Sequence, residues 1–69
     1  MSDTIYKITE VVGTSSTSIE DAVSGAVERA AKTVHDIGWF EVTDTRGHVE
    51  NGKVAHYQVT LRIGFRLQD

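Results

Sequence analysis

The sequence contains no cysteine, and this absence removes two kinds of stabilising feature. Without thiols the chain forms neither disulfides nor thiolate metal sites, and its composition fits a cytoplasmic location. Its 69 residues make one small domain, 1–69. A domain of this size buries only about 60 % of the surface that its unfolded form exposes. We therefore expect oligomerisation to supply the missing core.

Other common signals are also missing. No apolar run approaches the roughly 20 residues that cross a bilayer, and the first residues lack the basic and apolar regions of a secretory signal. The net charge of −3 argues against general nucleic-acid binding. There is no nucleophile elbow, phosphate-binding glycine loop or dinucleotide fingerprint, and the three histidines show no metal-ligand spacing with carboxylates. We therefore expect no catalytic site, no metal site, and no membrane or nucleic-acid partner.

The charge that is present is unevenly distributed. Residues 1–45 carry three basic and eight acidic side chains, a balance of −5, whereas residues 46–69 carry four basic and two acidic ones, a balance of +2. A mildly basic segment on an acidic body suits a small anionic ligand better than a polyanion.

Two elements are predicted before residue 38. Residues 4–13 alternate polar with apolar side chains and are rich in β-branched and aromatic residues, which predicts a half-exposed strand. Apolar residues then recur at spacings of three and four, which predicts one long helix over 18–38. Gly38 can take the left-handed conformation that ends a helix. Two capping boxes mark the helix start: Thr17 with Glu20, and Ser18 with Asp21.

Residues 38–67 are typical of a β-hairpin folded at Asn51-Gly52, because both residues tolerate the positive φ of a type I′ turn. With a two-residue loop, position n on the first arm faces position 103 − n on the second. On the helix-facing side this register pairs Phe40 with Ile63 and Val42 with Leu61. On the other side it pairs Trp39 with Gly64, Glu41 with Arg62, Thr43 with Thr60, and Thr45 with Gln58.

The second arm carries the most apolar row of the chain, so we expect it at the centre of the sheet. The predicted fold is α+β, β-α-β-β, with a three-stranded antiparallel sheet wrapped around one long helix. That helix would be roughly 28 Å long, whereas the hairpin arms would reach roughly 43 Å. One end of the hairpin must overhang the helix, and other subunits should cover the overhang and the apolar edge strands.

Trp39 and Gln58 are the first candidate ligand-binding residues, both on the face away from the helix. Trp39 is either an aromatic plug or subunit contact, or a stacking platform for a planar ligand, with space beside it left by Gly64. Gln58 is either an ordinary exposed strand residue or an amide that reads the N–C=O edge of a flat heterocycle.

Three arginines and one glutamate complete the candidates. Arg46 and Arg66 either hold a phosphate or are ordinary solvated charges. Glu41 opposite Arg62 is most simply a cross-strand ion pair.

Four segments carry a family resemblance. These are YKITEVVGTSSTSIEDAV at the first strand and helix start, GWFEV at a tryptophan-bearing strand, RGHVENGKVAHYQV at the hairpin, and GFRL at the last strand end. Each segment alone is a weak signal. Together, in this order and at this total length, they resemble the dodecin family over almost the whole chain.

The resemblance implies a hollow dodecamer of cubic symmetry that binds flavins without turning over a substrate. In the family, two isoalloxazine rings stack between tryptophans of neighbouring subunits. The resemblance assigns the stacking role to Trp39 and contact with the flavin's pyrimidine edge to Gln58. It places Arg46 near the flavin phosphate, as in bacterial members, and Arg66 where some members bind coenzyme A. Archaeal members favour riboflavin-type ligands and bacterial members favour FMN.

One feature of the register conflicts with this assignment. In the strict register Arg46 lies on the opposite face from Trp39 and Gln58. Either a β-bulge redirects Arg46, or Arg46 serves a ligand on another subunit.

The leading hypothesis is a cytoplasmic, non-enzymatic protein that binds, stores and photoprotects a flavin (FMN, riboflavin or FAD) as a homododecamer. One alternative is a structural oligomer in which Trp39 is only an interface residue. Another is a coenzyme A-binding scaffold, and a less favoured one is a flavin-dependent reductase.

Overall fold

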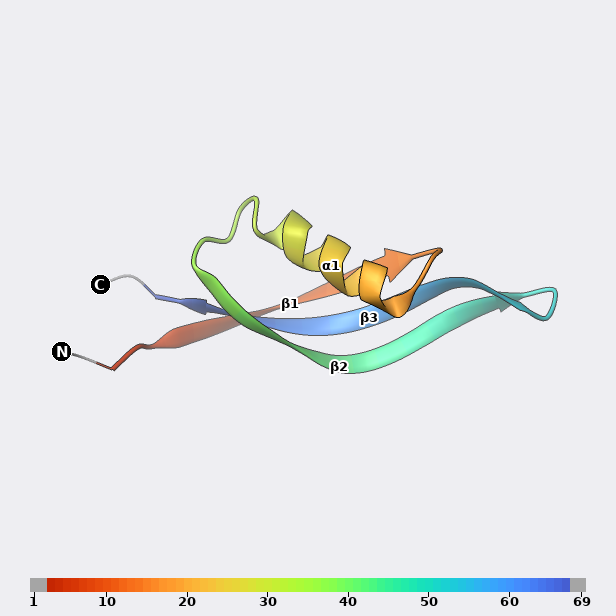
Figure 1. The fold of residues 1–69 in the computed structure, drawn as a ribbon. Helices are drawn as coiled ribbons and strands as arrows, with labels where there is room; N and C mark the ends of the chain where they lie inside the picture. Colours follow the sequence, from red (N-terminus) through yellow and green to blue (C-terminus); the bar gives the residue numbers. More distant parts are fainter. Residues whose placement is uncertain (1–2, 68–69) are drawn as a thin grey trace.

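The computed structural model describes residues 3–67, which form a strand, a helix and a long hairpin in the predicted order (Figure 1). The elements are β1 (Tyr6–Ser15), α1 (Ile19–Ala30), β2 (Ile37–Glu50) and β3 (Lys53–Arg66). The sheet order is β1-β3-β2, and β3 is antiparallel to both neighbours. The β-α-β-β fold with the last strand at the centre is therefore confirmed.

The start of α1 agrees with the sequence. Ser18 is the N-cap, and its side-chain oxygen accepts a hydrogen bond from the backbone N–H of Asp21 at 3.0 Å. The buried Ser15 secures the turn before it, because its hydroxyl accepts from the N–H of Thr17 at 2.9 Å and donates to the Asp21 carboxylate at 2.7 Å. Of the two predicted caps, Ser18 is the one that starts the helix. The reciprocal half of its box does not form, because the Ser18 N–H donates to the Ser15 hydroxyl at 3.3 Å rather than to the Asp21 carboxylate.

The predicted end of the helix at Gly38 is wrong. Helix α1 ends at Ala30, and the next N–H groups, those of Lys32 and Thr33, bond three residues back rather than four. Asp36, with φ of 63°, takes the left-handed conformation instead of Gly38, which lies in β2. The β-branched pair after Lys32 favours helix weakly, and the chain must reverse here to enter β2. Within residues 3–67 no helix is long and apolar enough to cross a membrane.

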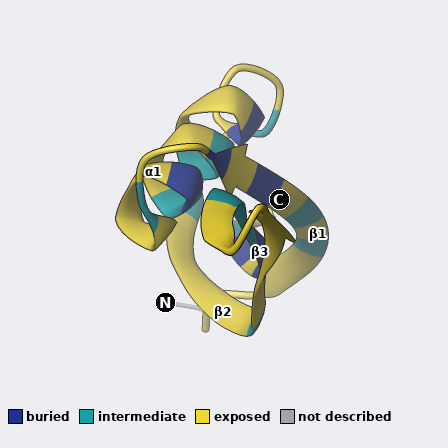
Figure 2. Ribbon diagram, turned by 90° about the vertical axis from the view of Figure 1, so that its right-hand side faces the viewer, coloured by how far each residue is buried: buried dark blue, intermediate teal, exposed yellow. Residues whose placement is uncertain are grey.

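The core lies between α1 and the two strands that it packs on, β1 and β3. Its largest fully buried side chains all come from one face of β3, namely Val59, Leu61 and Ile63. The helix approaches β1 closely, because a Cβ on Gly13 would meet the Ala22 carbonyl oxygen and lie 2.9 Å from the Ala26 Cβ. Figure 2 shows the buried positions under α1, whereas β2 is exposed along most of its length.

The hairpin extends far beyond the helix, as predicted. Helix α1 has 12 residues and is roughly 18 Å long, whereas β2 and β3 have 14 residues each and span roughly 46 Å. The chain measures 56 × 20 × 13 Å and leaves large apolar side chains exposed at both ends of β2, such as Phe40 and Val49. An isolated chain therefore has a thin core and much uncovered apolar surface.

Candidate functional site

The candidate residues lie on the sheet face that points away from α1, here called the outer face. Because side chains alternate along a strand, the β3 residues next to the buried ones point outward. They are Gln58, Thr60, Arg62 and Gly64. Residues from β1 and β2 flank them in continuous rows across the sheet.

Trp39 occupies one end of the outer face, opposite Gly64 as predicted. A Cβ built on Gly64 would fall on three indole atoms, Cε2, Cζ2 and Nε1, so the ring lies over Gly64. Tyr6 from β1 packs edge-to-face against it, with ring centroids 6.3 Å apart and an interplanar angle of 63°. The prediction that Gly64 leaves space beside the indole is wrong, because the indole itself fills that space. Trp39 is still 39 % exposed, so the ring is available on the side away from Gly64.

A β-bulge in β2 changes the register beyond Val42. From Trp39 to Val42 the pairs follow the predicted rule, but Thr43 is an extra residue, and its hydroxyl donates a hydrogen bond to the Thr60 carbonyl at 3.3 Å. The predicted pairs of Thr43 with Thr60 and Thr45 with Gln58 are therefore wrong. Thr60 instead faces Asp44, and Gln58 faces Arg46.

The bulge brings Arg46 to the outer face beside Gln58. Of the two explanations left open by the sequence, the redirecting bulge is the one found in the chain. The Arg46 Nε lies 2.9 Å from Asp44 Oδ2, and both side chains are well exposed. This contact leaves the terminal guanidinium nitrogens of Arg46 for another acceptor. Gln58 is half-buried, and within residues 3–67 its side-chain amide has no hydrogen-bonding partner.

Trp39 and Gln58 share a face, but they are far apart along it. Gly64, over which the indole lies, is six residues from Gln58 on β3, a separation of roughly 20 Å along an extended strand. Within one chain these side chains therefore do not converge on one small ligand.

The remaining arginines have different surroundings. Arg66 faces Tyr6 at the Trp39 end of the sheet, is exposed, and lines a cavity of about 350 Å³ together with the turn that precedes β2. Arg62 faces Glu41 as predicted, but its ion pair is with Glu10 of β1, with Nε and Oε2 3.8 Å apart. The predicted Glu41–Arg62 ion pair is replaced by this contact, because Arg62 on the central strand has an acidic neighbour on both sides.

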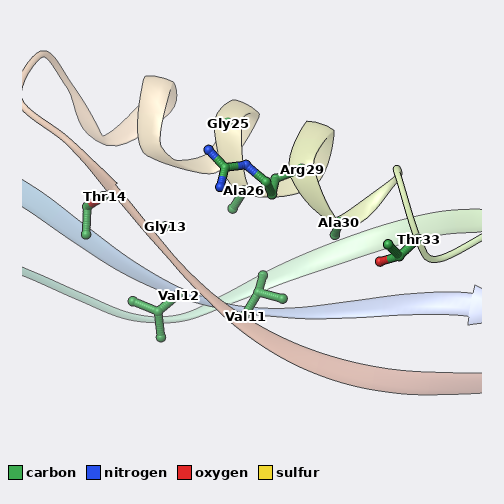
Figure 3. Close-up of a pocket in the computed structure, with 9 residues that line it drawn as sticks. All are labelled: Val11, Val12, Gly13, Thr14, Gly25, Ala26, Arg29, Ala30 and Thr33. Atoms are coloured by element: carbon green, nitrogen blue, oxygen red, sulfur yellow. The ribbon is translucent and has the colours of Figure 1, made fainter.

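A separate cavity of about 490 Å³ lies between α1 and the free edge of β1 (Figure 3). Its lining combines small helix residues with one charged side chain: Val11, Val12, Gly13, Thr14, Gly25, Ala26, Arg29, Ala30 and Thr33. None of the four predicted site residues lines it.

Sequence reasoning missed one pair of residues on the outer face. His48 and His56 stack on each other near the hairpin tip, with ring centroids 5.4 Å apart. A second register shift, between His48 and Val49, makes them direct neighbours. No sequence signal marks these two bulges, because a single extra residue breaks the polar–apolar alternation at only one position.

Comparison with known proteins gives a consistent result. The family model described as Dodecin matches residues 5–68. A dodecin from Thermus thermophilus is 45% identical over 65 residues, covering 94% of both chains. The structure of dodecin from Streptomyces coelicolor superposes with a TM-score of 0.92 at 52% identity, covering 100% of this chain and 99% of that one. The calcium dodecin of Mycobacterium tuberculosis is more distant, at 33% identity over 93% of this chain and 90% of that protein.

Proposed function

The chain belongs to the dodecin family, and from this premise we propose that it binds a flavin, stacking the isoalloxazine ring on the indole of Trp39. Dodecins are non-enzymatic proteins that bind small molecules, flavins among them, and that form oligomers. The chain is accordingly not an enzyme. FMN is the flavin that we propose.

The observation that carries the proposal is the position of the indole. It lies over Gly64 and against Tyr6, which hold it in place, and it remains 39 % exposed on the outer face. A fixed and exposed aromatic ring is a suitable platform for a flat heterocycle. An indole in van der Waals contact with an excited flavin can donate an electron to it, which quenches the excited state and suppresses photochemistry.

The arrangement supports a binding site shared between chains. An isoalloxazine on Trp39 is too far along the sheet for Gln58 of the same chain, given their separation of roughly 20 Å. The Gln58 amide that reads the flavin's N–C=O edge would come from a neighbouring copy. The uncovered apolar surface at both ends of β2 supports such an assembly, and we propose a homododecamer built from the single 1–69 domain.

The two candidate arginines have different proposed roles. Arg46, beside Gln58 on the outer face and with guanidinium nitrogens free of Asp44, would bind the FMN phosphate. Arg66 remains a predicted ligand-binding residue at the other end of the face. Coenzyme A gains no support from the family match, and we do not propose it as a ligand.

Titration of FMN into flavin-free protein, followed by flavin fluorescence, tests the proposal. We expect strong quenching in the wild type. Trp39→Ala should remove most of the quenching and weaken binding by about tenfold to a hundredfold, as expected for loss of an aromatic stack. Trp39→Phe is the matched control, because it retains a ring for stacking and should bind more tightly than Trp39→Ala.

Two outcomes would contradict the proposal. Unchanged affinity and quenching in Trp39→Ala would show that the ring is not the platform. Wild-type protein that takes up no flavin, while still oligomeric in solution, would instead favour a purely structural role for Trp39 at a subunit interface.

A further inference from the structure

Two histidines near the hairpin tip are brought together by the backbone. His48 on β2 lies directly opposite His56 on β3, with ring centroids 5.4 Å apart and an interplanar angle of 17°. The register shift between His48 and Val49 leaves Ala55 as an extra residue on β3. Without this bulge His48 would face Ala55 and the two imidazoles would lie on opposite faces.

A carboxylate stands beside the pair. The Nε2 atom of His48 lies 3.4 Å from the Oε2 atom of Glu50. Histidines that bind metals usually donate one ring N–H to a carboxylate or carbonyl and use the other ring nitrogen as the ligand. Glu50 lies close enough to Nε2 to take this role after a small side-chain rotation, and Nδ1 of His48 would then keep a free lone pair.

A hollow next to His56 offers room for a hydrated ion. This cavity of about 350 Å³ is lined by His56 and by three hydroxyl-bearing residues at the end of β1, namely Thr14, Ser15 and Ser16. The Ser15 hydroxyl is already used in the turn before α1. The hydroxyls of Thr14 and Ser16 can accept hydrogen bonds from water molecules bound to an ion.

The nearby cations do not prevent binding. Lys53 faces Glu50 at the turn, and Arg46 lies in the row next to the histidines. The Arg46 guanidinium is paired with Asp44 at 2.9 Å and is well exposed. Solvent therefore screens its charge, and the Glu50 carboxylate contributes a negative charge closer to the imidazoles.

We propose that His48 and His56 form a two-histidine clamp for a divalent first-row transition metal ion, with Glu50 orienting His48 and water completing the coordination shell. Neutral imidazole nitrogen suits Ni²⁺, Cu²⁺ and Zn²⁺, whereas Ca²⁺ takes oxygen ligands. Across residues 3–67 no three His, Asp or Glu side chains converge on one point. The metal thus has two protein ligands, and one imidazole turns out of the stack to bind it.

The proposal revises the expectation of no metal site. That expectation rested on spacing along the chain. His48 and His56 are eight residues apart, and this separation is not a metal-ligand signal by itself. The clamp would join β2 and β3 in the region that α1 leaves uncovered. Because the ion binds the folded hairpin and not the unfolded chain, it would stabilise the fold by mass action.

The test is calorimetric titration of ZnCl₂, and separately NiCl₂ and CaCl₂, into flavin-free protein freed of metal with a chelator. We expect about one Zn²⁺ per chain, and a further titration with CuCl₂ should show Cu²⁺ binding more tightly than Ni²⁺ or Zn²⁺. His48→Ala and His56→Ala should each weaken Zn²⁺ binding by about tenfold or more, and Glu50→Gln by about tenfold. His35→Ala, which alters the one histidine outside the pair, is the matched control and should bind as the wild type does.

A second measurement needs no variant. Long-range ¹H–¹⁵N spectra of the wild type should show Zn²⁺ shifting the ring nitrogens of His48 and His56 and leaving those of His35 unchanged. Zn²⁺ affinity that is unaffected by either substitution in the pair, equal loss in His35→Ala, or Ca²⁺ binding as tightly as Zn²⁺ would overturn the proposal. The titrations contain no flavin, so their outcome is independent of the proposed flavin site.

Discussion

The two halves of the long hairpin differ in what fixes their register. From Trp39 to Val42 the strand β2 pairs with β3 in the simple order that a two-residue turn predicts, along the segment of β3 that holds the buried Leu61 and Ile63. Beyond Val42 the pairing is set by bulges at Thr43 and Ala55.

A buried face penalises any slip, because a shift of one residue exposes every core side chain. In the distal half only Val59, next to the Thr43 bulge, is fully buried, and toward the turn such a face is lacking: Val49 and Val54 are 63% and 54% exposed. The buried core therefore fixes the pairing register of β2 with β3 in the first half. In the uncovered half, the bulges decide which polar side chains lie on the outer face.

The largest expected effect is on the free energy of unfolding, measured for one substitution in each half of the hairpin. Leu61→Ala removes a side chain that is 0% exposed and should lower the free energy of unfolding by about 2–5 kcal/mol. Val54→Ala, in the distal half, should change it by about 0.5 kcal/mol or less in a lone chain. Denaturant unfolding at one fixed protein concentration measures both. An equal loss for Val54→Ala would mean that the distal half is packed as tightly as the core.

The next effect tests the arginine that the bulge places on the outer face. Arg46→Ala removes the guanidinium beside Gln58 and should leave the pairing of β2 with β3 unchanged. If Arg46 binds the FMN phosphate, this change should cost about 1.5–3 kcal/mol of FMN affinity, the range for a hydrogen bond to a charged group, and leave riboflavin affinity unchanged. Fluorescence titration with both flavins measures this. A retained preference for FMN in Arg46→Ala would contradict the role of Arg46.

The smallest effects come from two glycines. Gly25 lies in α1 with open space around its Cα, so Gly25→Ala should stabilise the chain by about 0.5–1 kcal/mol. Gly52 has φ of 76° in the turn at the hairpin tip, so Gly52→Ala should destabilise it by about 1 kcal/mol. Thermal unfolding of both variants checks the signs. Stabilisation by Gly52→Ala would show that the tip does not keep its type I′ turn.

Most of the fold could be predicted from the sequence, because the determining signals are local or periodic. Asn51-Gly52 identifies the turn, and the Ser18 cap identifies the helix start. The apolar row of β3 identifies the central strand. The helix end was misplaced because the apolar spacing continues past Ala30, while the reversal at Asp36 depends on where β2 must begin.

The site was less predictable for physical reasons. The pairing of Trp39 with Gly64 follows from the turn, but the indole's position over Gly64 depends on packing with Tyr6. The pairing of Arg46 with Gln58 depends on an extra residue at Thr43 that no periodic pattern reveals. Side chains in an uncovered region carry little information about the strand register, so their cross-strand neighbours cannot be predicted from the sequence alone.

The contact between Trp39 and Tyr6 makes the chain its own folding reporter. Trp39 is the single tryptophan of the sequence, and its ring touches residues from β1 and β3 while belonging to β2. Light absorbed by Tyr6 at a centroid distance of 6.3 Å passes efficiently to the indole by resonance energy transfer. The rise of tyrosine-sensitised tryptophan emission during refolding would therefore time the docking of β1 onto the hairpin, without an added dye.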